Sequence, residues 1–135
     1  MFVVDTNIIA ALYVRGAYSE AVQRLHARDQ VWRTDPFALI EFSNVLASYE
    51  RARYLTAASA RQCLADAQDF LRPHYFVVRH DAALAMAIRY GITAYDGRFL
   101  ALAHQLDSRL VTEDAKLRTA APKLTQSIAE ALATA

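Results

Sequence analysis

The sequence predicts an α/β domain built around a short central parallel sheet, and three observations lead to that prediction. Short apolar runs without polar alternation, such as Phe2–Val4 and Leu110–Thr112, are typical of strands buried on both faces of a parallel sheet. Longer segments with helical periodicity and capping residues separate these runs. The chain holds only 3 glycines and 3 prolines, which favours helices in those segments. Strands that alternate with helices indicate a parallel sheet.

In the first half of the chain we expect two strands and four helices. The strands are placed at Phe2–Val4 and Gln30–Arg33, and the helices at Thr6–Val14, Glu20–Arg28, Phe37–Arg53 and from Thr56 to just before Pro73. Serine, threonine and aspartate are preferred N-caps, and proline is favoured at the first helical position. By these preferences Ser19, Asp35 with Pro36, and Thr56 are predicted to begin three of the helices.

In the second half we expect two further strands and three helices. The strands are placed at Phe76–Val78 and Leu110–Thr112, and the helices at His80–Tyr90, Tyr95–Leu106 and Lys123–Leu132. Gly91 suits the position just after a helix, where a left-handed backbone is common. Thr93 and Pro122 are predicted to begin the last two helices.

Composition and charge narrow the class of protein. A length of 135 residues predicts a single domain over residues 1–135, and 55% hydrophobic with 21% charged residues excludes a disordered chain. A net charge of +1 excludes a uniformly basic coat for nucleic acid. The single cysteine, Cys63, excludes an internal disulfide and a zinc cluster. Asp5 and Asn7 interrupt the apolar N-terminal segment, which lacks a basic region, so we expect a cytoplasmic protein without a signal peptide.

Four carboxylates are the candidate functional residues. Asp5 and Asp114 each follow a predicted strand, at the carboxyl end where the functional groups of parallel sheets gather. Asp96 lies in the first turn of a predicted helix, and Glu41 shares a narrow polar stripe with Asn44 and Ser48 on a helix that is otherwise mostly apolar. Taken singly, each has an ordinary explanation as a cap, a partner of the helix dipole or a solvent-facing side chain.

If the four carboxylates converge, they repel one another, and each raises the pKa of the others unless a cation lies among them. Ligands that are all oxygen suit Mg²⁺ or Mn²⁺ rather than Zn²⁺. One or two such ions polarise a phosphoryl oxygen and activate water, so hydrolysis of a phosphodiester is the natural reaction class.

Four segments carry a resemblance to a known family. VVDTNI, LIEFSNVL, AYDGRFLALA and LVTEDAKL, in this order and spacing, resemble the four acidic motifs of PIN-domain nucleases. The size of the chain is similar to that of the VapC-type toxins of bacterial toxin–antitoxin pairs. The resemblance covers essentially the whole chain and implies a three-layer α/β/α PIN-like domain.

The resemblance also implies a function. It makes the protein a metal-dependent endoribonuclease, the toxin of a type II toxin–antitoxin pair, with Asp5, Glu41, Asp96 and Asp114 as catalytic metal ligands for Mg²⁺ or Mn²⁺. Asn7 and Thr112 match supporting positions that orient ligands or water. The expected partners are an RNA substrate, a small antitoxin that occludes the acidic site and a second copy of the chain in a homodimer.

Two residues depart from the usual form of the third motif. Gly97 and Arg98 follow Asp96, where relatives often carry alanine and a small or apolar residue. Glycine inside a helix costs about 1 kcal/mol relative to alanine, so either another backbone approaches Gly97 closely or the start of the helix is loose, and the second is preferred. For Arg98 a contact with phosphate and simple exposure to solvent both remain open, and the second is preferred.

Other residues are weaker candidates for binding RNA. A possible basic path is formed by Arg15, Arg24, Arg28, Arg51 and Arg53. Possible stacking aromatics are Tyr49, Tyr54, Phe70, Tyr75 and Phe76. At their spacings both sets are more typical of a solvated face and of core or interface positions.

Two alternative functions are kept. VVDTN also resembles the nucleophile motif of haloacid-dehalogenase-like phosphatases, although these need a second aspartate where this chain has Asn7. The other alternative is a non-catalytic PIN scaffold that binds RNA or protein, against which the complete acidic set argues.

Overall fold

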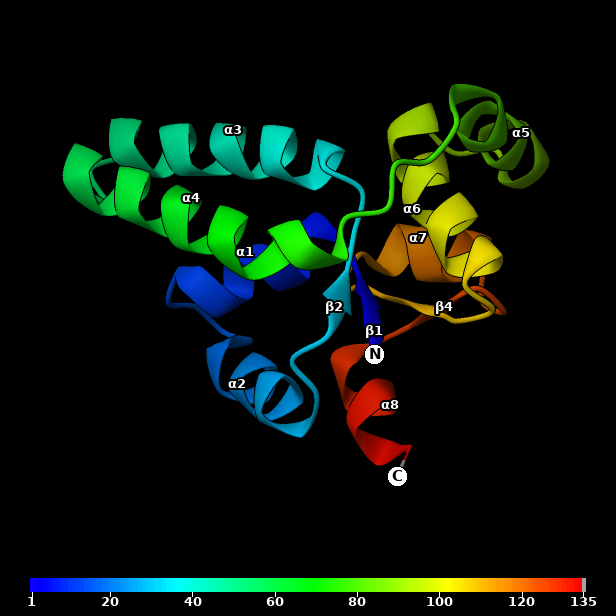
Figure 1. Cartoon of the computed structure of the whole chain (residues 1–135), viewed down its shortest axis with the longest axis horizontal. Coiled ribbons are helices and arrows are strands. Elements are labelled where there is room, and N and C mark those ends of the chain that lie inside the picture. The colour runs from blue at the N-terminus through cyan, green and yellow to red at the C-terminus, as the bar shows by residue number, and fades with distance from the viewer. Residues whose placement is uncertain (135) are drawn as a thin grey trace.

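The structure, a computed structural model, describes residues 1–134 and has a four-stranded parallel sheet at its centre (Figure 1). The strands are short and lie in the order β2-β1-β3-β4. Their bounds are Phe2–Val4 for β1, Trp32–Arg33 for β2, Leu110–Val111 for β3 and Thr125–Gln126 for β4. Because β1 and β3 are neighbours in register Val4↔Val111, the residues that follow them emerge side by side at the carboxyl edge of the sheet.

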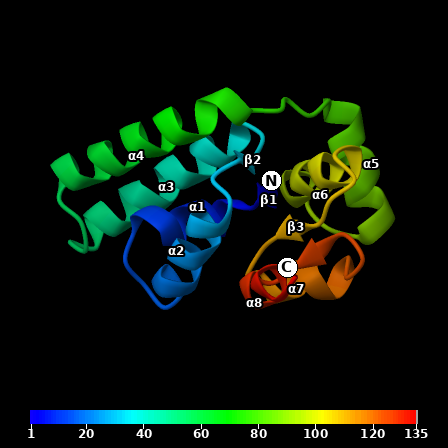
Figure 2. The ribbon, with the colours of Figure 1, turned by 60° about the horizontal axis from the view of Figure 1, so that its bottom comes forward.

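Helices form the outer layers. Within the described residues the α-helices are α1 (Thr6–Tyr13), α2 (Ser19–Arg28), α3 (Phe37–Arg51), α4 (Ala57–Leu71), α5 (His80–Tyr90), α6 (Ala94–Gln105), α7 (Ala115–Ala120) and α8 (Ile128–Ala133), with a 3₁₀ turn, η1, at Arg72–His74. Figures 1 and 2 show the antiparallel pair α3 and α4 on one side of the sheet and the pair α5 and α6 on the other. The predicted three-layer α/β/α class with a central parallel sheet is confirmed.

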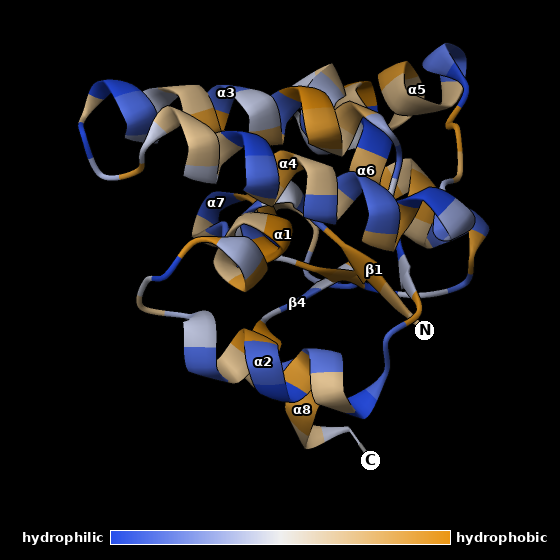
Figure 3. Ribbon diagram, turned by 60° about the vertical axis from the view of Figure 1, so that its left-hand side comes forward, coloured by the Kyte–Doolittle hydropathy of each residue, from blue (hydrophilic) through white to orange (hydrophobic). Residues whose placement is uncertain are grey.

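A continuous apolar core fixes the sheet between these layers. Val3, Val4, Leu110 and Val111 of the two central strands are fully buried, as the apolar runs predict. The stretch Phe99–Ala103 of α6 is buried as well, which makes α6 the most enclosed helix. In Figure 3 the orange β1 ribbon runs between helices that alternate in colour, as expected for amphipathic helices around a buried sheet. Across residues 1–134, no helix is both long and apolar enough to cross a membrane.

Local capping signals placed most helices correctly. The Thr56 hydroxyl accepts the Ser59 N–H at the start of α4, and the Thr93 hydroxyl accepts the Asp96 N–H at the start of α6. Asp35 Oδ1 accepts the Phe37 N–H at the start of α3. Gly91 ends α5 with a left-handed backbone, φ +65°. These caps fix where α3 and α6, the helices that carry Glu41 and Asp96, begin.

Three predictions are wrong: one cap is replaced by a local turn contact, and one strand and one helix are overridden by contacts remote in sequence. Ser19 does not cap α2: it lies inside the helix, and its hydroxyl accepts the Gly16 N–H instead. Phe76–Val78 is not a strand, since Val77 is 74% exposed and the Val78 N–H is bound by the Asp35 carboxylate rather than by a strand. The predicted helix over Lys123–Leu132 is instead β4, which pairs with β3, followed by α8 with Ser127 as its cap.

Candidate functional site

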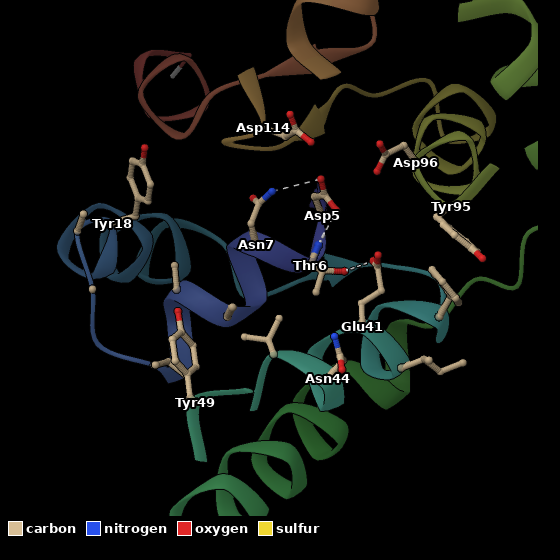
Figure 4. A pocket seen from close by; sticks show the side chains of 18 of the residues that line it. Asp5, Thr6, Asn7, Tyr18, Glu41, Asn44, Tyr49, Tyr95, Asp96 and Asp114 are labelled. Atoms are coloured by element: carbon tan, nitrogen blue, oxygen red, sulfur yellow. Dashed lines mark hydrogen bonds between the residues drawn. The ribbon is translucent and has the colours of Figure 1, made fainter. Parts of the chain in front are cut away.

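The four predicted carboxylates line one pocket of about 800 Å³ at the carboxyl edge of the sheet (Figure 4). Asp5 comes from the end of β1, Glu41 from α3, Asp96 from the first turn of α6 and Asp114 from the segment between β3 and α7. Figure 4 shows Asp5 at the centre of the group, with the other three arranged around it. Residues up to 109 positions apart in the sequence are thus brought to one place.

Asp5 is the most enclosed of the four, with 5% of its surface exposed. It is the N-cap of α1, and its Oδ1 accepts the Thr6 N–H at 2.7 Å. Its Oδ2 accepts the Thr112 hydroxyl at 2.8 Å and the Asn7 side-chain amide at 3.3 Å. The carboxylate therefore has a fixed orientation toward the pocket.

The two predicted supporting residues form one network with Asp5. The Asn7 amide also donates to the Thr112 hydroxyl at 3.1 Å, while its Oδ1 accepts the Glu113 N–H. The Thr112 hydroxyl in turn accepts the Asp114 N–H at 3.1 Å. This network ties the end of β1 to the segment that follows β3, so Asn7 and Thr112 hold Asp5 and the Asp114 backbone in place.

Glu41 faces the same pocket from α3. Its Oε1 accepts the Thr6 hydroxyl at 2.7 Å, which joins α3 to the start of α1. Asn44, one turn further along α3, also lines the pocket, as its place in the polar stripe predicts. Glu41 and Asn44 therefore face the pocket, whereas Ser48, the third residue of the stripe, is exposed and lies outside the pocket lining.

Asp96 and Asp114 come from the other side of the sheet and both stand near helix N-termini. Asp114 is the N-cap of α7, and its Oδ1 accepts the N–H groups of Lys116 and Leu117. Asp96 lies in the first turn of α6, where the helix dipole favours a negative charge. Both ordinary explanations for these residues are thus correct, and both side chains nevertheless line the pocket.

Burial and mutual repulsion raise the pKa values of three of these carboxyls. Burial is the largest cause for Asp5 and raises its pKa to about 7, although hydrogen bonds from Thr112 and Thr6 act in the opposite direction. Burial also raises the pKa of Glu41 and of Asp96. The charge of Asp96 adds to the rise at Glu41, and that of Asp114 to the rise at Asp96. Each of these three pKa values is thus raised in part by the charge of a neighbouring carboxylate.

No basic side chain compensates this charge among the described residues. The five ion pairs there involve other acids, namely Asp29, Asp81, Asp35, Glu130 and Glu113. Glu113, although next to Asp114, faces away: it binds the Ile128 N–H and pairs with Arg118. The four carboxylates thus have no ion-pair partner among the described residues, and Arg15, which also lines the pocket, pairs with none of them.

The donor set fits a hard divalent cation in its chemistry. All four groups are carboxylates, which are the ligands that Mg²⁺ and Mn²⁺ prefer. Within residues 1–134 no three acidic, histidine or cysteine side chains form a ready group of metal ligands. Mg²⁺ generally keeps several of its waters and takes only one or two carboxylates directly, so a closed cage of side chains is not required of such a site.

Gly97 and Arg98 have structural roles beside Asp96. A Cβ on Gly97 would lie 2.4 Å from the carbonyl oxygen of Ala83, so glycine allows α5 and α6 to pack closely, and the preferred expectation of a loose helix start is wrong. The preferred expectation for Arg98 is wrong, because its side chain is only 14% exposed and pairs with Asp35 at 3.2 Å. It also donates to the Val78 carbonyl at 2.6 Å and contacts His80. Asp35 caps α3, so this ion pair connects the helix of Glu41 to the helix of Asp96.

Of the weaker candidates for RNA binding, only Arg15 and Tyr49 line the pocket. Arg28, by contrast, donates to the Leu132 carbonyl and so binds the C-terminal helix. Two other tyrosines, Tyr18 and Tyr95, also line the pocket and were not predicted from the sequence. The position of Tyr95 directly before a candidate acid was the signal that could have identified it.

The fold and the site together define a class of protein. Its members are α/β/α domains with a parallel sheet and an acidic pocket at the carboxyl edge of that sheet. A family model described as the PIN domain matches residues 2–122, and the chain belongs to the PIN-domain family. Ribonuclease VapC3 of Pyrobaculum aerophilum is 33% identical over 125 residues, which cover 90% of this chain and 95% of that protein.

Two crystal structures share the fold. PAE2754 from Pyrobaculum aerophilum superposes with a TM-score of 0.71 at 19% identity, covering 97% of this chain and 91% of its own. FitAcB from Neisseria gonorrhoeae superposes with a TM-score of 0.64 at 17% identity, covering 94% and 96%. The family assignment replaces the phosphatase alternative, whose motif this chain matched only in part.

Proposed function

We propose that this protein is a divalent-metal-dependent endoribonuclease and the toxin of a type II toxin–antitoxin pair. The observation that carries the proposal is the gathering of Asp5, Glu41, Asp96 and Asp114 from four separate elements around one pocket without a basic partner among the described residues. The similarity to ribonuclease VapC3 over most of both chains supports RNA as the substrate.

In this proposal the four carboxylates hold Mg²⁺ or Mn²⁺. The bound ion supplies positive charge that activates the attacking water and offsets the charge developing on the phosphate. Thr112 and Asn7 keep both oxygens of Asp5 in a fixed orientation, and the Thr6 hydroxyl does the same for Glu41. Thr6, Asn7 and Thr112 are positioning residues, because their contacts are with the carboxylates.

The antitoxin is the proposed regulator of this site. Carboxylates that have no ion-pair partner among the described residues also accept a basic side chain, which replaces the charge of the ion. We therefore propose a small partner that places lysine or arginine among the four carboxylates and so blocks both metal and RNA. The protein is further proposed to act as a homodimer of single PIN-like domains in the cytoplasm.

The function is tested by incubating purified protein with cellular RNA in Mg²⁺, in Mn²⁺ and in excess EDTA. We expect internal cleavage with either ion and none with EDTA. Water attacks phosphorus and the bond to the 3′-oxygen breaks, so the products should carry 5′-phosphate and 3′-hydroxyl ends. Cleavage that continues in EDTA, or products with a 2′,3′-cyclic phosphate, would contradict the metal-dependent mechanism. No cleavage under any condition would favour the non-catalytic scaffold.

A further inference from the structure

One large aromatic side chain at the edge of the acidic pocket is mostly exposed to solvent. Tyr95 precedes Asp96 on α6, lines the same pocket and is 63% exposed. Its hydroxyl forms no hydrogen bond with any residue that the structure describes. An exposed large aromatic side chain at a polar site is a common mark of a binding surface.

The ring of Tyr95 is held in one orientation by the ring of Phe37, on which it stacks. It stacks on Phe37 with ring centroids 5.4 Å apart and an interplanar angle of 12°, and Phe37 itself packs against the buried Phe99. One face of Tyr95 is thus covered by a parallel ring, and the opposite face is left for another planar group. A fixed aromatic face loses little conformational freedom when such a group binds.

The rest of the pocket continues on the other side of the carboxylates. Figure 4 shows Tyr18 and Tyr49 opposite Tyr95, with Asp5 and Glu41 between them. Tyr18 and Tyr49 are 50% and 38% exposed. Arg15 lines this end, and its guanidinium takes part in no ion pair of the described residues. The pocket therefore offers aromatic faces on both sides of the acidic group and a free cation at its far end.

We propose that Tyr95 is a stacking platform for a nucleobase of single-stranded RNA, next to the phosphate that lies at the carboxylates. This inference rests on the proposed ribonuclease function and names the form of RNA that the site takes. Bases in a duplex are already stacked on one another, whereas bases in loops and single strands are free to stack on a protein ring. Arg15 then contacts the backbone of the same strand where it leaves the pocket.

Recognition of this kind is tolerant of sequence, because every base has an aromatic face. The site should therefore select the single-stranded state of the RNA more strongly than the identity of the stacked base. A helix or apolar side chain of a protein partner is the competing occupant of Tyr95. The parallel Phe37–Tyr95 pair favours a planar ring over an aliphatic group, since it extends an existing stack.

The first test measures cleavage of a single-stranded oligoribonucleotide by parent, Tyr95→Ala, Tyr95→Phe and Ile88→Ala, with Mn²⁺. Loss of one base–aromatic stack should raise KM about 5- to 150-fold in Tyr95→Ala, with a smaller effect on kcat. Tyr95→Phe should recover most of the lost affinity, because it keeps the ring. Ile88 is 74% exposed and outside the pocket, so Ile88→Ala controls for the loss of exposed apolar surface.

The second test removes the base instead of the ring. Once the cleaved bond is mapped, oligonucleotides with an abasic residue at each flanking position are compared. At one position the abasic substrate should weaken binding to the parent as much as Tyr95→Ala does, and should cause little further loss in Tyr95→Ala. Independent, additive losses at every position would overturn the stacking proposal.

The outcomes separate this proposal from the function on which it rests. If the parent cleaves RNA and Tyr95→Ala retains the parent KM, stacking is wrong and the ribonuclease function stands; an anchor for a protein partner would behave in this way. If the parent cleaves a duplex as well as a single strand, the proposed selectivity is wrong. If the parent cleaves no RNA with any ion, both proposals fall.

Discussion

Asp5 is the residue on which the proposed chemistry depends most. It is buried, oriented by three hydrogen bonds and placed at the centre of the acidic group. Asp5→Asn removes the charge that an ion requires while keeping the shape, so we expect cleavage to fall by at least about 100-fold with the fold retained. RNA cleavage and far-UV circular dichroism measure the two effects.

Glu113→Gln is the matched control for this variant. Glu113 is adjacent to Asp114 in sequence, but its carboxylate contacts Ile128 and Arg118 rather than the pocket. Cleavage by Glu113→Gln should stay close to that of the parent. If Asp5→Asn cleaves as fast as Glu113→Gln, then Asp5 does not hold the ion.

The raised pKa of Asp5 predicts how stability depends on pH in the metal-free protein. In the unfolded chain Asp5 ionises near its ordinary value of 3.8, whereas in the folded protein it stays protonated up to about pH 7. Between these values the unfolded state binds fewer protons, so the free energy of unfolding falls as pH rises from about 4 to about 7. Above pH 7 this group adds no further change.

Melting temperature against pH in EDTA, for the parent and for Asp5→Asn, isolates this effect from other titrating groups. The parent should lose stability relative to Asp5→Asn across that interval, since asparagine does not ionise. Parallel curves for the two proteins would show that burial does not shift the Asp5 pKa.

How well each site residue could be predicted depends on whether its signal was local. Asp5 and Asp114 were identifiable because an acid directly after a buried apolar run marks the carboxyl edge of a parallel sheet. Glu41 was identifiable from its polar stripe. The partner of Arg98 was not, because Asp35 lies 63 positions away and nothing near Arg98 in sequence indicates an ion pair. Tyr95 was missed because exposure cannot be read from one helical position.

At the scale of elements, the close contact between α5 and α6 places Asp96. Gly97→Ala would bring a Cβ to 2.4 Å from the Ala83 carbonyl oxygen and 3.0 Å from the Ala87 nitrogen, both backbone atoms that yield only if the helices separate. Overpacking of this kind costs about 1–3 kcal/mol, which exceeds the gain of about 1 kcal/mol from alanine in a helix. We expect a lower melting temperature and, because α6 shifts, slower cleavage.

Gly16→Ala is the appropriate control, since no atom lies within 4 Å of a Cβ at that position. Its stability should equal that of the parent or exceed it slightly, because alanine reduces the freedom of the unfolded chain. If Gly97→Ala is as stable as Gly16→Ala, the two helices are not packed as closely as the structure shows.

Helix ends were predicted better than short strands, for a physical reason. The caps at Thr56, Thr93 and Gly91 are contacts within a few residues, so the sequence carries them. The strand β4 has only two residues, and its existence depends on pairing with β3. The segment Phe76–Val78 has a strand-like composition, but the Val78 N–H donates to the Asp35 carboxylate and is therefore not available for pairing with a strand.

For the whole molecule, the acidic site lowers the free energy of unfolding of the metal-free protein. Burial and the neighbouring acids raise the pKa of Asp5, Glu41 and Asp96, so each of these groups destabilises the metal-free fold when it is ionised. A divalent cation bound among these carboxylates, as we propose, would remove that penalty in the folded state only. The proposed metal binding would then be coupled to global stability through the same carboxylates that the proposed reaction uses.

The coupling predicts that Mg²⁺ raises the melting temperature of the parent. It also predicts that Glu41→Gln changes both the stability gained with Mg²⁺ and the stability of the metal-free protein. Ligand linkage gives about 2.7 kcal/mol of added stability when the free ion is at 100 times its dissociation constant. Glu41→Gln should lose most of this gain because a charged ligand is gone. In EDTA near pH 7 the same variant should be more stable than the parent, since glutamine avoids burying a charge near Asp96 and its side-chain oxygen can still accept the Thr6 hydroxyl.

Asp81→Asn, which alters an exposed ion pair, should respond to Mg²⁺ as the parent does. Equal shifts with Mg²⁺ for the parent and Glu41→Gln would remove Glu41 from the metal site, and a parent that ignores Mg²⁺ and Mn²⁺ would remove the site itself.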